Sequence, residues 1–294
     1  MRLSNSAAAL LILSVMTTVV VAQSKLPDGQ PNIQGMYTRA GVKSVEADPP
    51  FNPIDPGEKN PFSVSNREDG LGPYPRIFGA GGNVLRGSQQ RVQRRIGIVF
   101  PENRKLPWRP EEDAKRRQFL LDMNPSKDLR HVELNSRCAL PGLFEGEDGN
   151  NPYTFFQPAG KVVIVYDYNH TSRVIDLSRK EHLGKGIRLF MGDSIGRWEG
   201  NTLVVDTTNY NGRIAYSREM PYLSEDLHTI ERFTVADANT IDYEVTIEDP
   251  KLFTGPWKVA GYFSRAAKDV DSIEFACAEG SQTLQNIFGA PPAR

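Results

Sequence analysis

The chain has 294 residues, of which 39% are hydrophobic, and its 35 Lys and Arg residues nearly balance its 36 Asp and Glu residues. This length is enough for a well-filled core, in one large domain or two small ones. A net charge of −1 leaves no basic excess to neutralise phosphates, so nucleic acid is not expected as a partner. The composition also excludes collagen-like repeats, coiled coils and disulfide-dense mini-scaffolds.

Residues 1–22 have the pattern of a signal peptide. Arg2 is the only charge before Lys25, the run from Ala7 to Ala22 is almost wholly apolar, and small residues precede Gln23. The run is shorter than a typical transmembrane helix, and no later stretch reaches 18 apolar residues. We therefore predict an exported protein, periplasmic or secreted, with no integral membrane span after the signal is removed.

The chain has two cysteines, Cys138 and Cys277. In an exported protein both would reside where disulfides persist. The sequence contains neither a CxxC motif nor a Cys/His cluster that would indicate a metal site instead. We predict a disulfide between them, with two buried free thiols as the alternative.

Residues 23–130 are predicted to form an extended N-terminal arm. Up to about Asn103 this stretch is interrupted by many Pro, Gly and Asn turn signals. Pro110, followed by three acidic residues, predicts one short helix over about 110–123. Asn124 and Pro125 end this helix.

From about Pro152 onward, short apolar stretches alternate with turn signals and predict eight strands. They are Val162–Tyr168, Ser172–Leu177, Ile187–Met191, Thr202–Tyr210, Leu227–Thr234, Ile241–Glu248, Trp257–Phe263 and Ser272–Cys277. Almost no helix separates them, so neighbouring strands should pair antiparallel. The predicted fold is mainly β: residues 131–294 close an up-and-down, lipocalin-like β-barrel around one small ligand. A two-sheet β-sandwich is the alternative.

Four stretches resemble those of a large group of exported bacterial proteins of unassigned function. They are PDGQPNIQG at 27–35, GDSIGRWEGNTLVVDT at 192–207, SEDLHTIERF at 224–233, and TIEDP at 246–250 with PW at 256–257. Two positions depart from the group's pattern: Asn201 stands in place of Asp, and Leu183 follows His182 in place of Pro. The resemblance implies export and membership of the group, and it implies no activity.

Two motifs resemble catalytic or metal-binding motifs, but each is better explained by ordinary strand and turn structure. Gly192–Gly196 matches the GxSxG nucleophile elbow, which lies on a strand-to-helix turn, whereas a strand follows here, so we predict a turn between strands. His228 and Glu231 are three residues apart on a strand and face opposite sides, so they cannot share a metal ion. We predict no cofactor and no metal ligand, with a divalent metal held by carboxylates as the alternative.

Charged and polar side chains within the apolar strands are the candidate site, because they are costly to bury unpaired. We predict Glu231, Asp206 and His228 as acid–base catalysts. The predicted substrate-binding residues are Arg173, Arg197, Trp198, Tyr166 and Tyr243. Strand alternation places Glu231 among apolar residues, facing the barrel lumen, and His228 on the opposite face. A purely structural pairing of Arg197 with Asp206 or Glu231 is the alternative.

These residues favour an enzyme that processes a small molecule in the barrel, as a lyase, isomerase, cyclase or hydrolase. The sequence lacks a Rossmann glycine pattern and a CxxCH haem site, so no redox cofactor is expected. Two alternatives stay open. The barrel could carry an apolar or sugar-like ligand without chemistry, or the N-terminal arm could serve an envelope-interaction protein.

Overall fold

A computed structural model gives the three-dimensional arrangement of the chain. It describes residues 25–40, 97–102, 106–123, 126–132, 138, 152–167, 171–215, 222–267, 270, 277 and 282–288. The predicted signal peptide, residues 41–96 of the predicted arm, and all but the last residue of the predicted strand Ser272–Cys277 lie outside these ranges.

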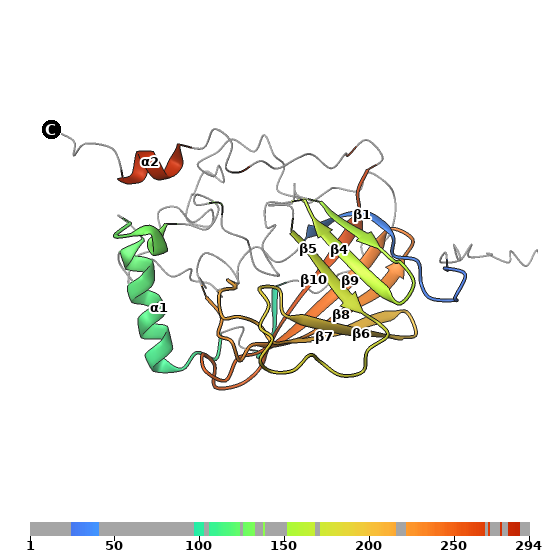
Figure 1. Cartoon of the computed structure of the whole chain (residues 1–294), viewed down its shortest axis with the longest axis horizontal. Helices are drawn as coiled ribbons and strands as arrows, with labels where there is room; N and C mark the ends of the chain where they lie inside the picture. The colour runs from blue at the N-terminus through green and yellow to red at the C-terminus, as the bar shows by residue number, and fades with distance from the viewer. Residues whose placement is uncertain are drawn as a thin grey trace, which may run out of the picture.

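One sheet contains the strands of the described residues. They are β1 (Gly35–Ala40), β2 (Gly97–Phe100), β3 (Tyr153–Phe156), β4 (Lys161–Tyr166), β5 (Thr171–Asp176), β6 (Asp193–Glu199), β7 (Thr202–Thr208), β8 (His228–Asp237), β9 (Thr240–Glu248) and β10 (Trp257–Arg265). Neighbours pair in the order β1, β3 and then β4 to β10, and β1 also pairs with β10, which closes a barrel (Figure 1). β2 pairs with the first part of β10 and β1 with its second part. The predicted mainly β barrel is confirmed.

Strand pairing departs from the predicted up-and-down pattern at one place. β5 and β6 run parallel over two residue pairs, whereas the other neighbouring strands of the barrel are antiparallel. A parallel pair needs a crossover connection, and residues 177–192 supply it as a loop. The prediction of a strand over Ile187–Met191 is wrong, because these residues belong to that loop. Leu189 in this stretch bonds the backbone of Asn209 and Asn211 beyond the end of β7 instead of forming a ladder.

The turn predicted over Gly192–Gly196 is confirmed only at its first residue. Gly192 has φ +68°, in the left-handed region that favours glycine, and it ends the loop before β6. Gly196 lies within β6, where a Cβ atom would come within 2.7 Å of Ile175 and 2.9 Å of Leu177. The second glycine therefore permits close packing of β6 against β5 and does not mark a turn.

Strand β1 comes from the segment predicted as an arm. It pairs with β3 on one side and with β10 on the other. Without it, β3 and β10 would each present an unpaired edge. Only Met36 and Tyr37 are large apolar residues in this strand, too few for the alternation that identified the later strands. The barrel is thus completed by a strand far from the others in sequence.

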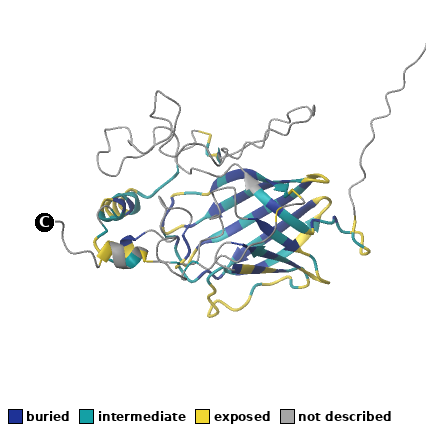
Figure 2. Cartoon of the chain, turned by 90° about the horizontal axis from the view of Figure 1, so that it is seen from above, coloured by how far each residue is buried: buried dark blue, intermediate teal, exposed yellow. Residues whose placement is uncertain are grey.

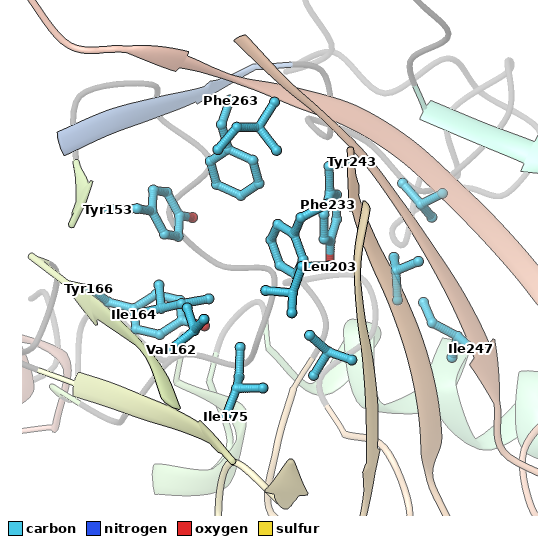
Figure 3. Packing of buried hydrophobic residues seen from close by; sticks show 14 of the residues in the cluster. Tyr153, Val162, Ile164, Tyr166, Ile175, Leu203, Phe233, Tyr243, Ile247 and Phe263 are labelled. Carbon is cyan, nitrogen blue, oxygen red and sulfur yellow. The ribbon is translucent and has the colours of Figure 1, made fainter. Parts of the chain in front are cut away.

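The lumen holds the main hydrophobic core. Buried residues run along the strands of the barrel (Figure 2). Burial alternates in β5, β8 and β9, and in β9 Ile241, Tyr243, Val245 and Ile247 are buried while their neighbours are only partly so. Aromatic rings from different strands meet edge to face across the interior (Figure 3). Phe263 on β10 packs against Tyr153 at 5.3 Å and Tyr243 at 5.5 Å between ring centroids. Such pairs add about 0.5–1.5 kcal/mol each beyond area burial.

Helix α1 (Pro110–Asp122) confirms the helix predicted over about 110–123, and it lies beside one end of the barrel (Figure 1). Its start is tied down by Trp108, whose ring packs 4.6 Å from that of Phe253, and by the Arg109 N–H, which donates to the Leu252 carbonyl. A short 3₁₀ helix (Leu129–His131) and α2 (Thr283–Phe288) complete the helical elements of the described residues.

Cys138 and Cys277 form a disulfide, as predicted, with their Cα atoms 5.6 Å apart. The bridge joins positions 139 residues apart in the sequence. It therefore closes a loop that contains strands β3 to β10.

Candidate functional site

The predicted site residues separate into two clusters, one inside the barrel and one outside. The lumen cluster is centred on an ion pair between Arg173 on β5 and Glu231 on β8, whose Nη2 and Oε2 atoms are 2.5 Å apart. Only 2% and 3% of these two side chains are exposed. Strand alternation therefore places Glu231 in the lumen, as expected from its apolar neighbours.

Neighbouring strands supply further hydrogen bonds to this pair. Arg173 donates from Nε to the Ser194 hydroxyl at 2.9 Å and from Nη2 to the Thr207 hydroxyl at 2.7 Å. The Tyr243 hydroxyl donates to the other Glu231 oxygen at 3.0 Å. Five consecutive strands, β5 to β9, thus each contribute one residue to a buried polar belt. Both Glu231 oxygens are occupied, which suits a structural ion pair.

The electrostatics of the lumen keep Arg173 charged and Tyr166 neutral. Burial alone would lower the pKa of Arg173, but the adjacent Glu231 carboxylate outweighs burial and raises that pKa. Burial raises the pKa of Tyr166 to about 12, so its hydroxyl stays neutral at physiological pH. The lumen cluster brings together four predicted residues: Arg173, Glu231, Tyr166 and Tyr243.

The outer cluster joins Asp206 on β7 and His228 on β8 to His182 of the β5–β6 loop. Asp206 Oδ1 lies 3.0 Å from His228 Nε2 and 3.0 Å from His182 Nε2. One carboxylate oxygen thus bridges two imidazole rings. Asp206 and His228 face outward because they alternate with lumen-facing Thr207, Thr229 and Glu231.

Each imidazole also contacts a second carboxylate. His182 Nδ1 lies 3.1 Å from Asp193 Oδ2, and His228 Nδ1 lies 3.2 Å from Glu248 Oε2. Asp193 further accepts from the Arg179 guanidinium at 2.6 Å and from the Leu183 N–H at 2.8 Å. The result is an unbroken chain of alternating acidic and basic groups that crosses the outside of β6 to β9.

This arrangement favours a protonated His228 ring, because a ring can donate to two carboxylates only when both nitrogens carry hydrogen. The hydrogen bond to Asp206 raises the pKa of His228 above its ordinary value, against the opposing effect of burial. The same bond is the largest of the effects that lower the pKa of Asp206. Burial would raise the pKa of Asp193, but its bonds from Arg179, Leu183 and His182 outweigh burial and lower it.

Two predicted substrate-binding residues belong to neither cluster. Arg197 is exposed and pairs with Glu199 at 2.6 Å, so the predicted pairing with Asp206 or Glu231 is wrong. β6 alternation explains this, since Arg197 points outward near the far end of the strand. Trp198 is partly buried and packs against the lumen core.

Four members of the outer cluster were not predicted from the sequence: Arg179, His182, Asp193 and Glu248. His182 and Arg179 lie in an irregular loop, where periodicity gives no direction for a side chain. Asp193 was interpreted as a turn residue. Glu248 could have been found, because it alternates outward on β9 and the register places it directly opposite His228.

Within the described residues, no set of three or more His, Cys, Asp or Glu side chains has an arrangement that could hold a metal ion. Among the same residues we find no helix with the length and apolar character needed to cross a membrane. The two pockets we describe lie outside the lumen. One of about 450 Å³ is at the barrel end near α1, and one of about 350 Å³ is beside residues 26–34.

Comparisons with protein families and with curated proteins find no match to this chain. Among solved structures, a mutant of the fluorescent protein UnaG is similar to it over 42% of this chain and 78% of that chain. The two share 13% sequence identity, with a TM-score of 0.26. Similarity at this level carries no information about what the chain binds or does.

Proposed function

We propose that the chain is an exported protein that performs acid–base chemistry on a small molecule, with His228 as the proton-exchanging group. The observation that carries this proposal is the continuous chain from Glu248 through His228, Asp206 and His182 to Asp193. Exposure is highest at one end and lowest at the other: 46% of the Glu248 side chain is exposed, 30% of His228 and 33% of Asp206, and 4% of Asp193. The outer end can meet a substrate while the inner end is fixed in the protein.

The geometry gives each residue a role. Asp206 holds the His228 ring and stabilises its protonated form, which raises the pKa of His228 above its ordinary value and keeps a proton available for transfer. His182 in turn holds Asp206 and fastens it to the loop. Glu248 is the exposed group at the other His228 nitrogen, and a substrate that displaced it would meet the Nδ1–H directly.

This proposal keeps Asp206 and His228 as the catalytic residues and gives Glu231 a structural role. Lyases, isomerases, cyclases and hydrolases all contain steps that need only proton transfer by such groups. The resemblance to exported bacterial proteins supports export. The Cys138–Cys277 disulfide supports it as well, since disulfides persist in oxidising compartments.

We expect the variant His228→Gln to lose turnover. Because a positioned general acid or base contributes about 10²–10⁴-fold, the rate should fall by about 100-fold or more. The measurement is turnover of the mature, oxidised protein on a panel of small esters, lactones, β-elimination substrates and aryl glycosides.

Glu244→Gln is the matched control, because Glu244 lies on the same outer face of β9 and pairs with Lys258 away from His228. It should retain the wild-type rate. Equal turnover by wild type and His228→Gln would contradict the proposal, as would a panel on which the wild-type protein shows no turnover.

A further inference from the structure

The 450 Å³ pocket opens at the barrel end that carries the outer cluster. Its walls come from α1, the loop after β7, the segment before β8 and the segment after β9. Glu225 lines it three residues before His228, and Lys251 lines it three residues after Glu248. Three residues span at most about 11 Å of extended chain. The pocket and the His228–Glu248 pair therefore lie at the same end of strands β8 and β9.

The floor of the pocket is apolar. Leu223 and Leu252 line it and are themselves almost fully buried in the core. Tyr222 adds an aromatic ring that is held in place by an edge contact with Phe119 of α1, at 6.4 Å between ring centroids. An apolar floor with an aromatic wall is the usual base of a small-molecule site, and about 300–1,000 Å³ is the usual volume.

The rim is polar, and its charged groups are already engaged in ion pairs. Lys251 Nζ lies 3.0 Å from Glu225 and 3.3 Å from Asp226. Glu112 pairs with Lys115 at 2.6 Å. The rim therefore offers hydrogen-bond donors and acceptors on groups that already have ion-pair partners, and these groups carry one excess negative charge. A charged ligand would have to displace one of these ion pairs, whereas hydroxyl groups can both donate to and accept from them.

The pocket walls are fixed by local structure. Gly212 has φ +70°, and a Cβ atom there would lie 3.2 Å from the Glu225 nitrogen, so the two loops touch closely. Buried Asp249 accepts hydrogen bonds from the backbone N–H and the hydroxyl of Ser224, both at 2.7 Å. The loop before β8 is thereby tied to the loop after β9, which gives a preformed site.

We propose that this pocket binds a neutral, polyhydroxylated molecule of the carbohydrate class and presents it to His228 and Glu248. The C–H face of a sugar ring would pack on Tyr222, while its hydroxyls would bond to the paired rim. The binding half of this inference stands on the pocket alone, and the presentation half rests on the proposed function.

Saturation-transfer NMR and calorimetry with glucose, galactose, cellobiose and maltose test the binding, with glucuronate and glucosamine as charged comparators. Glu225→Trp fills the pocket with a bulky ring, and Glu102→Trp is its matched control, because Glu102 is exposed and does not line the pocket. We expect at least one neutral sugar to bind saturably, more tightly than both comparators. Glu225→Trp should weaken it about tenfold or more, or about 1.4 kcal/mol, and Glu102→Trp should not.

The inference is overturned if no neutral sugar binds, if a charged comparator binds more tightly, or if Glu225→Trp binds as wild type does while it unfolds at the same temperature. His228→Gln separates this inference from the proposed function. Sugar binding retained by a variant that has lost turnover supports both. Sugar binding to a wild-type protein that turns nothing over would leave the pocket correct, as a carrier site, and the acid–base proposal wrong.

Discussion

We expect Glu231→Gln to lower the free energy of unfolding by about 3–5 kcal/mol, because it leaves the Arg173 guanidinium charged and unpaired in the lumen. Only 2% of the Arg173 side chain is exposed, so water cannot replace the lost carboxylate. Arg173 cannot escape by losing its proton at any physiological pH. Urea unfolding of the oxidised protein, followed by circular dichroism, measures the change.

The double variant Arg173→Met with Glu231→Leu is the informative control. It removes both charges together, and replacing a buried ion pair with apolar side chains of similar volume is often close to neutral. We expect it to be more stable than Glu231→Gln alone. If Glu231→Gln costs less than about 1 kcal/mol, the cost of one ordinary hydrogen bond, the pair is not buried as described.

Replacing both cysteines with alanine is expected to lower the free energy of unfolding by about 4–5 kcal/mol. The chain-entropy model gives this value for a closed loop of 139 residues, since the bridge restricts the unfolded chain over that length. Urea unfolding of wild type and of the variant Cys138→Ala with Cys277→Ala measures it.

Wild-type protein unfolded in the presence of reductant is the matched control, and it should match the double variant. The loss of stability should also lower the urea concentration at the midpoint of unfolding. Lumen packing should not change, because the bridge lies outside the lumen core. A double variant as stable as the oxidised wild type would contradict this prediction, because it would show that the bridge does not stabilise the fold by restricting the unfolded chain.

The strands that could be predicted from the sequence are those with a continuous apolar run or a clear alternation of apolar and polar residues. β9 alternates over its full length, and β4, β5, β7, β8 and β10 lie where they were expected. The parallel β5–β6 pair could not be predicted, because its crossover is an irregular loop and not a helix. β6 was missed because Gly192 before it, and Asp193 and Gly196 within it, have the composition of a turn, and only packing against Ile175 and Leu177 shows why Gly196 is needed.

The candidate site was predicted as a set of residues but not as an arrangement. Alternation correctly separates Glu231 from His228, yet both are predicted from the sequence as acid–base catalysts of one site. Asp206 lies on the outer face of the barrel with His228, because the pairing of β7 with β8 places Asp206 opposite Ile230, two residues from His228. His182 completes the cluster through a loop whose path depends on tertiary contacts, for which local sequence carries no signal.

The most direct test of the central claim is an NMR titration of the histidine ring nitrogens in wild type and in Asp206→Asn, between about pH 5 and 9. A coupled His228–Asp206 unit predicts a His228 pKa above 6.5 in wild type, and a clear decrease in Asp206→Asn. Because the folded pKa is raised, the protonated ring stabilises the fold below pH 6.5, and this contribution is lost as the pH rises through the folded value. A His228 pKa at or below 6.5 that Asp206→Asn leaves unchanged would contradict the account.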